Sequence, residues 1–287
     1  MSSLTSKPVF RWGLIGPGRI AGQFARALNA IENSCLQAVA GRNRRRTEKF
    51  AREHGVATCY EDYRELLDDP LIDAIYIAAP HRFHHELTRD CLLAGKPTLC
   101  EKPLTVNARE AGELIELSRN SGVFLMEALW TRFLPIYEDV SQWLVAGKIG
   151  EVTSISSSFG FKFPRDTSDR LLNHDLAGGV LLDMGVYNLS MSQWVFGGQP
   201  VKHTVDAFIG DTGVDEYSDT ILEYPDGRCS RFSNSMVRQL SNDLIIHGSG
   251  GHIQIHPMFW SATRATLVEG GNNRGLPRSV SSLREFR

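Results

Sequence analysis

The chain has 287 residues, 42% hydrophobic and 22% charged, which is typical of a globular protein with one large domain or two ordinary ones. Its net charge of −2 gives no reason to expect binding to nucleic acid or to an anionic membrane. No stretch approaches the roughly 18 apolar residues of a membrane span, and residues 1–8 lack the apolar core of a secretory signal. The 5 scattered cysteines contain no C-x-x-C motif, so we expect reduced thiols in a cytoplasmic protein.

The first part of the chain alternates short apolar runs with helical stretches. The apolar runs are typical of buried parallel strands and span residues 9–15, 36–40, 74–79, 98–100 and 123–126. Helical patterns lie between them at 20–30, 45–54, 63–67, 83–94 and 108–121. With right-handed crossovers, this repetition predicts an α/β protein whose N-terminal domain, residues 1–130, is a Rossmann doubly wound parallel sheet.

The second half of the chain has a different pattern. It predicts a helix at 136–146, a strand near 152–163 and a longer helix at 179–196. Strand-like runs follow at 201–209, 217–224, 229–238, 243–248, 251–256 and 263–268. Turn signals at 225–227 and 248–251 separate some of them, as in hairpins. Residues 131–287 are therefore predicted to form an α+β domain, with a mostly antiparallel open sheet and helices on one face.

A glycine-rich turn directly follows the first predicted strand and opens the first predicted helix. Its pattern is Gly16-x-Gly18-x-x-Ala21, typical of a dinucleotide-binding turn in this context. Gly16 permits the tight turn, Gly18 lets the backbone approach a pyrophosphate, and Ala21 allows close packing of helix on strand. The helix N-terminus, where we also place Arg19 and Ile20 in the cofactor site, supplies N–H donors.

The residues after the second predicted strand bear on the choice between NADP and NAD. NAD-selective sites usually carry an Asp or Glu here for the ribose 2′-hydroxyl, and none occurs between Val39 and Thr47. Arg42, Asn43 and Arg44 stand there instead, although cations near a helix start are disfavoured by its dipole. A bound 2′-phosphate would offset that cost, and a solvated basic face is the alternative. We predict NADP, with NAD less favoured.

The tripeptide Glu101-Lys102-Pro103 ends a short apolar run. A lysine where a nucleotide-binding sheet opens to solvent can polarise a carbonyl or help to deprotonate a hydroxyl. The alternative is a lysine that caps a strand beside a turn-forming proline. Asp183 and Tyr187 have i, i+4 spacing in the predicted helix 179–196 and share one face. A tyrosine can act as acid or base when a nearby cation lowers its pKa, and Lys102 is a candidate for that cation.

Both helical residues also have simpler interpretations. Asp183 alone would be a helix-surface carboxylate, and Tyr187 alone a core aromatic with its hydroxyl in a hydrogen bond.

Three histidines, His81, His84 and His85, follow Pro80 after the apolar run 74–79. No cysteine lies at ligand spacing, so we predict no metal site. In a doubly wound fold a nicotinamide ring lies here, and we assign Pro80, His81 and His84 to the cofactor site. At least one of the three histidines is expected to be exposed.

Several of these motifs resemble those of the Gfo/Idh/MocA oxidoreductase family. Within it the chain most resembles the branch of dimeric dihydrodiol dehydrogenase, NADP-dependent D-xylose dehydrogenase and glucose–fructose oxidoreductase. The resemblance runs from about residue 11 to about residue 271. It rests on four blocks, residues 16–21, 100–104, 126–135 and 176–187.

The resemblance implies an activity and its catalytic residues. Lys102 matches the lysine that contacts the reacting oxygen, Tyr187 the acid/base tyrosine of this branch, and Asp183 the aspartate that fixes the substrate hydroxyl. The implied enzyme transfers a hydride between NADP and a sugar, such as D-xylose, or a cyclic trans-dihydrodiol. An inactive or regulatory NADP-binding paralogue is the alternative, and a sugar–sugar oxidoreductase with tightly held cofactor is another.

The resemblance also implies a cofactor site and an assembly. His84 matches a histidine beside the nicotinamide, and Trp130 and Arg132 match a signature that lines the cofactor and substrate cleft. Glu101 is assigned with Lys102 to the cofactor site. A homo-oligomer, most simply a dimer, is implied.

The chain departs from the family after Glu269. A polar stretch runs from there to Arg287, where relatives continue into a further segment and a helix. We therefore expect the C-terminal end to be shorter than in relatives. We also expect several apolar residues to be less covered, which would raise self-association; they are Ile253, Ile255, Met258, Phe259 and Trp260.

Overall fold

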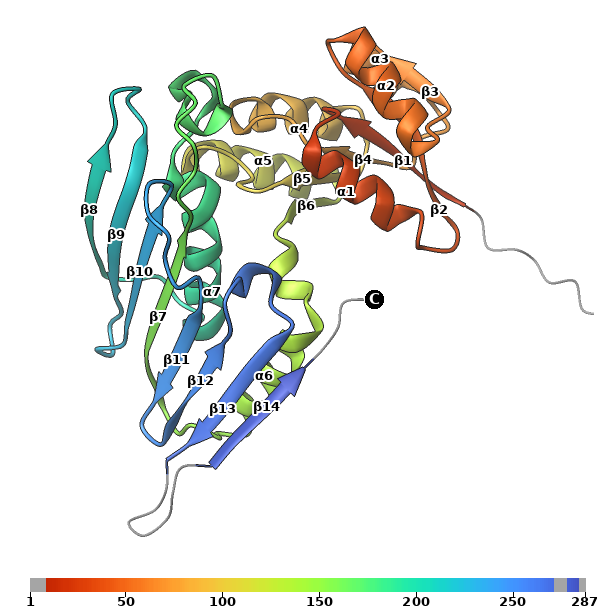
Figure 1. Ribbon diagram of the computed structural model, residues 1–287. Helices are drawn as coiled ribbons and strands as arrows, with labels where there is room; N and C mark the ends of the chain where they lie inside the picture. The colour runs from red at the N-terminus through yellow and green to blue at the C-terminus, as the bar shows by residue number, and fades with distance from the viewer. Residues whose placement is uncertain (1–8, 271–277, 284–287) are drawn as a thin grey trace, which may run out of the picture. The chain divides into compact units, whose positions relative to one another are not determined.

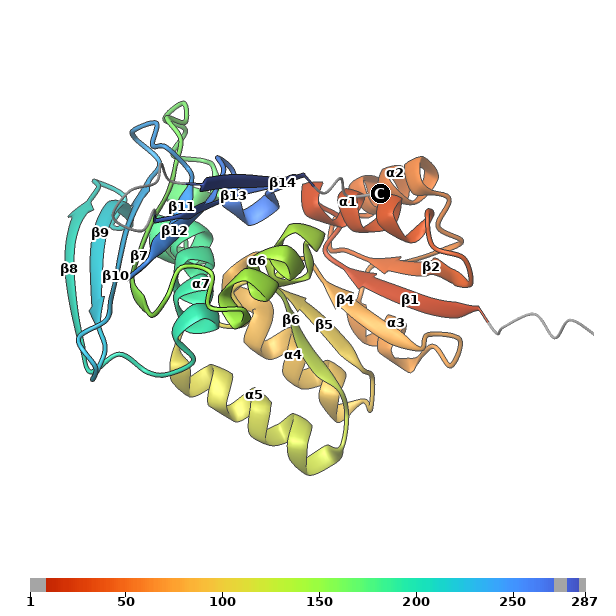
Figure 2. The ribbon, with the colours of Figure 1, turned by 90° about the horizontal axis from the view of Figure 1, so that it is seen from below.

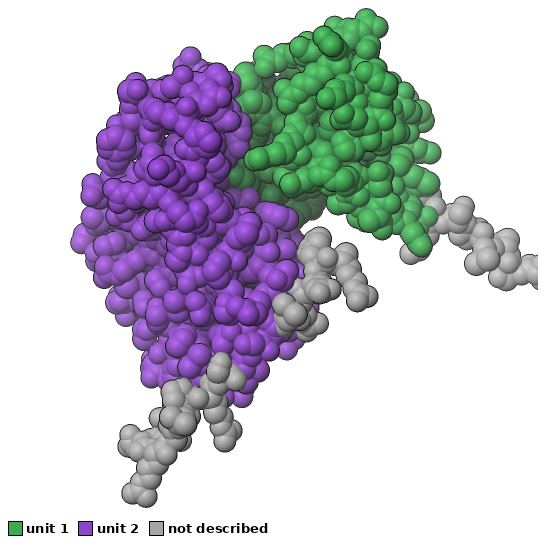
Figure 3. All heavy atoms as spheres, viewed as in Figure 1, with its two compact units in different colours: residues 1–128 green, residues 129–287 purple. Residues whose placement is uncertain are grey.

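A computed structural model describes residues 9–270 and 278–283. The chain divides into two compact units, residues 1–128 and 129–287, which Figure 3 shows in different colours. Each unit contains its own β-sheet, and the elements are labelled in Figure 1. Within the described ranges, no helix combines the length and the apolar character needed to cross a membrane.

The first unit contains a six-stranded parallel sheet in the order β3-β2-β1-β4-β5-β6. The strands are β1 (Phe10–Ile15), β2 (Ser34–Ala40), β3 (Thr58–Tyr60), β4 (Ala74–Ile77), β5 (Thr98–Glu101) and β6 (Leu125–Ala128). The predicted doubly wound sheet is confirmed. The strand order reverses between β1 and β4, and ligands of such sheets bind beyond the carboxyl ends of the strands at that point. The sequence did not predict β3, because three residues are too few for a recognisable pattern.

Helices cover both faces of this sheet (Figures 1 and 2). Leu14 and Val39 pack with α1 (Arg19–Leu28) and α2 (Arg44–His54) on one face. The next residues along each strand, Ile15 and Ala40, pack with α3 (Tyr63–Asp68) and α4 (His84–Leu93) on the other. A 3₁₀ turn, His81–Phe83, precedes α4, and α5 (Ala108–Ser121) packs beside α4. This alternation is the period of two that a strand buried on both faces requires.

The second unit contains an eight-stranded sheet in the order β14-β13-β12-β11-β7-β10-β9-β8. Only β7 and β10 pair in parallel among its neighbouring strands, so the predicted mostly antiparallel sheet is confirmed. The strands are β7 (Val152–Gly160), β8 (Lys202–Ile209), β9 (Asp215–Glu223), β10 (Cys229–Ser235), β11 (Leu244–Gly248), β12 (Gly251–Ile255), β13 (Arg264–Glu269) and β14 (Arg278–Leu283).

Two helices, α6 (Pro135–Val145) and α7 (Val186–Phe196), lie on one side of this sheet (Figure 2). Their apolar residues form one core with alternate residues of the strands. The prediction of a single helix over 179–196 is wrong at its start, because Leu181–Gly185 form a π-helical turn before α7. The strand predicted to reach residue 163 ends at Gly160, where a Cβ would lie only 2.7 Å from Leu240.

The sequence predicted no strand in the polar stretch after Glu269, but residues 278–283 form β14 and pair antiparallel with β13. The expectation that apolar residues near this end are less covered is wrong for all but one of them. Of the apolar residues expected to be less covered, Met258 is 48% exposed, but the others are buried; these are Ile253, Ile255, Phe259 and Trp260. The remaining parts of that stretch, 271–277 and 284–287, lie outside the described residues, as does segment 1–8.

Candidate active site

The glycine-rich turn links the end of β1 to α1. Gly16 has a φ of +94°, and a Cβ built on it would lie 2.9 Å from the backbone nitrogen of Ala79. Only glycine fits there, since both the conformation and the space exclude a side chain. A Cβ on Gly18 would have its nearest contact with Arg46 Nη2, at 3.8 Å. The turn therefore leaves its backbone open at Gly18, and the glycines present fit a dinucleotide pyrophosphate.

Three of the residues assigned to the nucleotide site begin α1 itself. Arg19 and Ile20 are exposed at the first turn, and Ala21 is fully buried against the sheet. The small side chain of Ala21 is what permits this close packing.

Asn43 and Arg44 lie at the start of α2, and the side chain of each bonds to a residue of that helix. Asn43 is the N-cap of the helix, and its side-chain oxygen accepts a hydrogen bond of 3.0 Å from Arg46 N. Arg44 forms ion pairs with Glu48 at 2.8 Å and with Glu61 at 3.4 Å, which raise its pKa. Two carboxylates thus already partner the charge of Arg44.

Arg42 and Arg46 occupy different surroundings from Arg44. The guanidinium of Arg42 lies over the Phe83 ring, 5.1 Å from its centroid, and so beside the turn that follows β4. Arg46 is the arginine that approaches Gly18 of the glycine-rich turn. The sequence interpretation missed Arg46. Its place in the first turn of α2 could have revealed it, because helical side chains point back toward the helix N-terminus.

The three histidines lie on the segment after β4. Here the prediction that at least one is exposed is wrong: His81 and His84 are buried and His85 is half-buried. Pro80 directly precedes the 3₁₀ turn. His84 Nδ1 lies 2.7 Å from Pro103 O, and His84 Nε2 lies 2.8 Å from Ala79 O. His84 therefore links the loop after β4 to the loop after β5.

The loop after β5 carries Lys102 and is held by two carboxylates. Glu101 accepts hydrogen bonds from the Tyr76 hydroxyl and, at 3.3 Å, from Lys102 N. Glu127 Oε1, on β6, accepts a hydrogen bond of 2.7 Å from Leu104 N. Burial raises the pKa of Glu127, and the Leu104 hydrogen bond and the Lys102 charge oppose this shift. The Lys102 side chain is half-buried.

Tyr187 lies in the second unit and is buried in the first turn of α7. Trp130 Nε1 donates a hydrogen bond of 3.2 Å to the Tyr187 hydroxyl. The Phe159 ring packs 5.6 Å from the Tyr187 ring and stacks on Trp260 at 3.5 Å. The tyrosine hydroxyl is thus placed beside aromatic rings, and Trp130 is itself 43% exposed.

A buried polar group fixes the orientation of α7. Asn188 is fully buried, and its side-chain nitrogen donates a hydrogen bond of 2.7 Å to Ser157 on β7. Its side-chain oxygen accepts one of 2.8 Å from Asn234 on β10. Because these bonds fix the rotation of α7 about its axis, they also fix the direction of the neighbouring Tyr187.

Asp183 lies in the π-helical turn and pairs with Arg170, whose Nη2 is 2.9 Å from Asp183 Oδ1. Two glycines place these segments together. A Cβ on Gly178 would lie 2.7 Å from the backbone oxygen of Arg170, and one on Gly179 would collide with the Asp215 carboxylate. Sequence reasoning missed Arg170, because no motif signals a partner in the short 3₁₀ turn Arg170–Leu172.

Arg132 follows Trp130 in the 3₁₀ turn Trp130–Phe133 and is exposed. The structure therefore gathers Glu101, Lys102 and His84 around one loop of the first unit. In the second unit it joins Tyr187 to Trp130 and Asp183 to Arg170. Across residues 9–270 and 278–283, no group of three or more His, Cys, Asp and Glu side chains is arranged to hold a metal ion.

Comparison with known proteins assigns the family. A model of the oxidoreductase family with an NAD-binding Rossmann fold matches residues 10–129, and a GFO/IDH/MocA C-terminal domain model matches 137–254. The trans-1,2-dihydrobenzene-1,2-diol dehydrogenase of Xenopus laevis is 39% identical over 91% of this chain and 79% of its own. The chain belongs to the Gfo/Idh/MocA oxidoreductase family. The human protein of the same name is 36% identical to this oxidoreductase, over 93% of the chain and 80% of its own.

Solved structures support the same assignment. A 3-ketoreductase from Actinomadura kijaniata, in complex with NADP and TDP-benzene, has a TM-score of 0.87 and 27% identity, over 97% of this chain and 85% of its own. A levoglucosan dehydrogenase in complex with NADH and levoglucosan shares the fold, with a TM-score of 0.87 and 19% identity, over 96% and 80%. This Gfo/Idh/MocA member is therefore an oxidoreductase with a nicotinamide cofactor.

Proposed function

We propose that the protein is an NADP-dependent dehydrogenase of a cyclic trans-diol, or of a sugar with a comparable pair of hydroxyls. The similarity to trans-1,2-dihydrobenzene-1,2-diol dehydrogenases, over 91% and 93% of the chain, supports a diol. The observation that carries the proposal is the Tyr187 hydroxyl, which is hydrogen-bonded to Trp130 and flanked by Phe159. A proton-transferring group beside aromatic rings suits a ring that bears hydroxyls.

The proposed mechanism divides the work between Tyr187, Lys102 and Asp183. The bound nicotinamide would supply the hydride chemistry. Tyr187 would take the proton of the reacting hydroxyl during oxidation and return it during reduction, and Trp130 would stabilise its oxygen. Lys102 would favour negative charge on the reacting oxygen. Asp183, oriented by Arg170, would hold the substrate hydroxyl.

NADP rather than NAD is proposed from the arginines. Arg46 approaches the glycine-rich turn, Arg42 lies on Phe83, and no acidic residue stands in the first turn of α2. Guanidinium groups suit a phosphate because they present several donors in a planar fork. Asn43 caps the helix and Arg44 is paired with carboxylates, so we expect both to contribute less than Arg42 and Arg46.

We also propose a dimer and a cytoplasmic location. Every residue of β8, the outermost strand beside β9, is exposed, including Val205, Phe208 and Ile209. An exposed apolar edge strand is a surface that a second copy can cover. All five cysteines are free thiols, as expected in a reducing compartment.

Turnover of a substrate panel tests the proposal. Purified protein is mixed with NADP⁺ or NAD⁺ and with trans-1,2-dihydrobenzene-1,2-diol, D-xylose or D-glucose, and absorbance of the reduced cofactor is followed. We expect turnover with NADP⁺ and the diol, and slower turnover with NAD⁺. NADPH binding by calorimetry without turnover of any substrate would instead favour a regulatory paralogue. Cofactor that survives gel filtration would favour a sugar–sugar oxidoreductase.

A further inference from the structure

The fully buried imidazole of His84 has an unusual pair of neighbours. Its Nδ1 lies 2.7 Å from Pro103 O, and its Nε2 lies 2.8 Å from Ala79 O. Both neighbours are backbone carbonyl oxygens, which only accept hydrogen bonds. A neutral imidazole has one N–H donor and one nitrogen that only accepts. It would therefore place a nitrogen lone pair against a carbonyl lone pair at one of these two contacts, whereas an imidazolium satisfies both.

We propose that His84 is held as an imidazolium ion and acts as the positioning residue for Lys102. The two carbonyl groups that it joins follow neighbouring strands, since Ala79 comes after β4 and Pro103 after β5. A doubly donating ring fixes the distance between these two loops.

The neighbouring hydrogen bonds show which part of the loop after β5 the His84 ring positions. Three successive backbone groups are held by three different side chains: Lys102 N by Glu101, Pro103 O by His84, and Leu104 N by Glu127. The backbone on either side of the Lys102 side chain is therefore fixed. Displacement of a reacting group by about 1 Å can cost about 100-fold in rate, so such support has a direct effect on turnover.

The same loop also carries charged side chains of both signs. A buried charge is costly unless compensating charges or hydrogen bonds accompany it. The strand ends that form the Lys102 loop carry two carboxylates, Glu101 and Glu127, and one ammonium, Lys102. With His84 protonated, these four groups carry two charges of each sign. The ring of His81 packs at 5.6 Å from that of His84.

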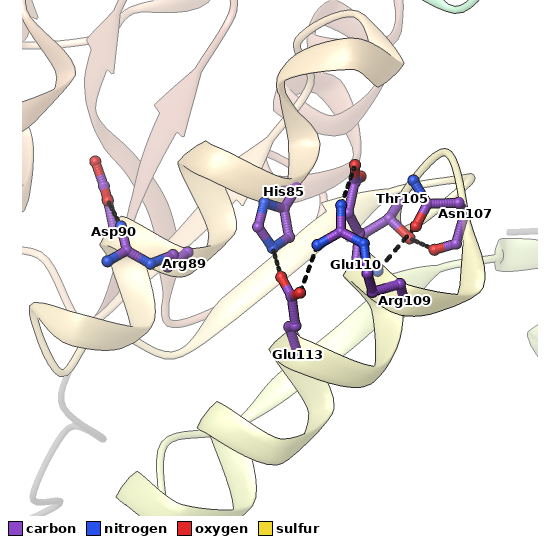
Figure 4. Close-up of polar contacts among 8 residues, drawn as sticks. All are labelled: His85, Arg89, Asp90, Thr105, Asn107, Arg109, Glu110 and Glu113. Atoms are coloured by element: carbon purple, nitrogen blue, oxygen red, sulfur yellow. Dashed lines mark hydrogen bonds and ion pairs between the residues drawn. The ribbon is translucent and has the colours of Figure 1, made fainter.

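The helix that carries His84 is itself anchored. Figure 4 shows the next residue, His85, directed at α5, where its Nε2 lies 3.0 Å from Glu113 Oε2. Arg109 also pairs with Glu113, at 2.6 Å, and Asn107 caps α5 through a 3.0 Å bond from Glu110 N (Figure 4). α4 and α5 are thus fixed to each other outside the Lys102 loop, and His85 supplies a control that lies one residue from His84.

The ring protonation state can be measured without any activity. Protein labelled with ¹⁵N-histidine, without added cofactor, is studied by NMR through the ring ¹⁵N resonances, with His84 assigned by comparison with His84→Gln. We expect both His84 nitrogens to carry protons at pH 7 and still at pH 8. One unprotonated nitrogen at pH 7 would overturn the proposal. The protonation state is read from the unsubstituted chain, so it does not depend on the turnover of any substrate. If His84→Gln does not fold, His84 is assigned by elimination, with each of the other histidines replaced in turn.

The positioning role has a separate test, which rests on the proposed function of Lys102. We expect His84→Gln to lower kcat by about 100-fold, while any weakening of NADPH binding measured by calorimetry is much smaller than this loss. In a Lys102→Met background the same substitution should have little further effect, because the two residues act as one unit. His85→Gln, the control, should leave kcat unchanged. Weakened NADPH binding with kcat preserved, or an undiminished effect of His84→Gln without Lys102, would contradict a role through Lys102.

Discussion

The indole N–H of Trp130 donates a hydrogen bond of 3.2 Å to the hydroxyl oxygen of Tyr187. A donor aimed at this oxygen stabilises it when the tyrosine has given up its proton. Asn188 holds α7 to its sheet and so fixes where the Tyr187 ring lies. The hydrogen bond from Trp130 then fixes the direction of the hydroxyl on that ring. Trp130 should therefore affect proton transfer as well as packing.

Replacement of Trp130 by phenylalanine separates these two contributions, since the ring is kept and the donor is lost. Removal of one such hydrogen bond costs about 1 kcal/mol. We expect kcat for diol oxidation to fall about 5- to 10-fold and its pH profile to move to higher pH. Trp194→Phe, in which the changed tryptophan packs on Tyr137, is the control and should keep both properties. An unchanged pH profile in Trp130→Phe would show that the bond has no part in proton transfer.

The arginines predict which substitutions alter cofactor choice. Charge-assisted hydrogen bonds contribute about 1.5–3 kcal/mol, so Arg46→Ala should raise the KM for NADP⁺ about 10- to 100-fold. Its KM for NAD⁺ should change little, because NAD⁺ has no 2′-phosphate. Arg42→Ala should act in the same direction. Arg45→Ala, on the same helical turn, is the matched control. Equal losses for both cofactors in Arg46→Ala would place Arg46 at the pyrophosphate instead.

Glu127 predicts a pH dependence of stability. Its pKa is raised in the folded protein, chiefly by burial. As pH rises above the ordinary range of a glutamate, the unfolded chain releases this proton first, so the free energy of unfolding falls. Glu127→Gln cannot release a proton and should lack this fall, so its stability relative to the natural chain should increase with pH across that window. Urea unfolding at several pH values measures the difference. A constant difference would show that Glu127 titrates normally.

The cysteines predict an order of chemical modification. Cys59 is exposed, whereas Cys91 and Cys100 are buried, and burial raises the pKa of the Cys91 thiol to about 12. Only the thiolate reacts, and partial burial and the Glu48 charge raise the pKa of Cys59 as well. Because its sulfur is accessible, a thiol reagent at pH 8 should still modify Cys59 before the two buried thiols, which should react only on unfolding. Peptide mapping by mass spectrometry follows each site, and Cys59→Ser should remove the fast reaction. Rapid labelling of Cys91 in the native protein would contradict its burial.

The sequence was sufficient for the features that depend on local pattern. Apolar runs with a glycine-rich turn predicted the parallel sheet of the first unit, because strand, turn and helix follow one another directly at Gly16. Short hairpins predicted the antiparallel sheet of the second unit. Lys102 and Tyr187 stood out because they occur in motif blocks. Their catalytic roles stay proposals.

Features that depend on contacts distant in sequence were missed. The π-helical turn at Leu181–Gly185 begins where Leu181 N binds the Asp215 carboxylate, 34 residues away. The partner of Asp183, Arg170, begins a short 3₁₀ turn, Arg170–Leu172, and has no sequence signal. The double contact of His84 could not be foreseen either, because His84 reaches Pro103 only once β4 and β5 are paired. The burial of Ile253 and Phe259 likewise follows from helices and strands that are remote in sequence.

The central claim, that Lys102 and Tyr187 serve one hydride-transfer reaction, is tested most directly by a double-mutant cycle. Turnover of trans-1,2-dihydrobenzene-1,2-diol with NADP⁺ is measured for the natural chain, Lys102→Met, Tyr187→Phe and the double variant, with NADPH binding as the check on folding. General acid–base groups contribute about 10²- to 10⁴-fold, so each single variant should lose at least about 100-fold in kcat. The double variant should lose far less than the product of the two. Unchanged turnover in Lys102→Met would contradict the account, and so would a loss in the double variant equal to the product of the two single losses.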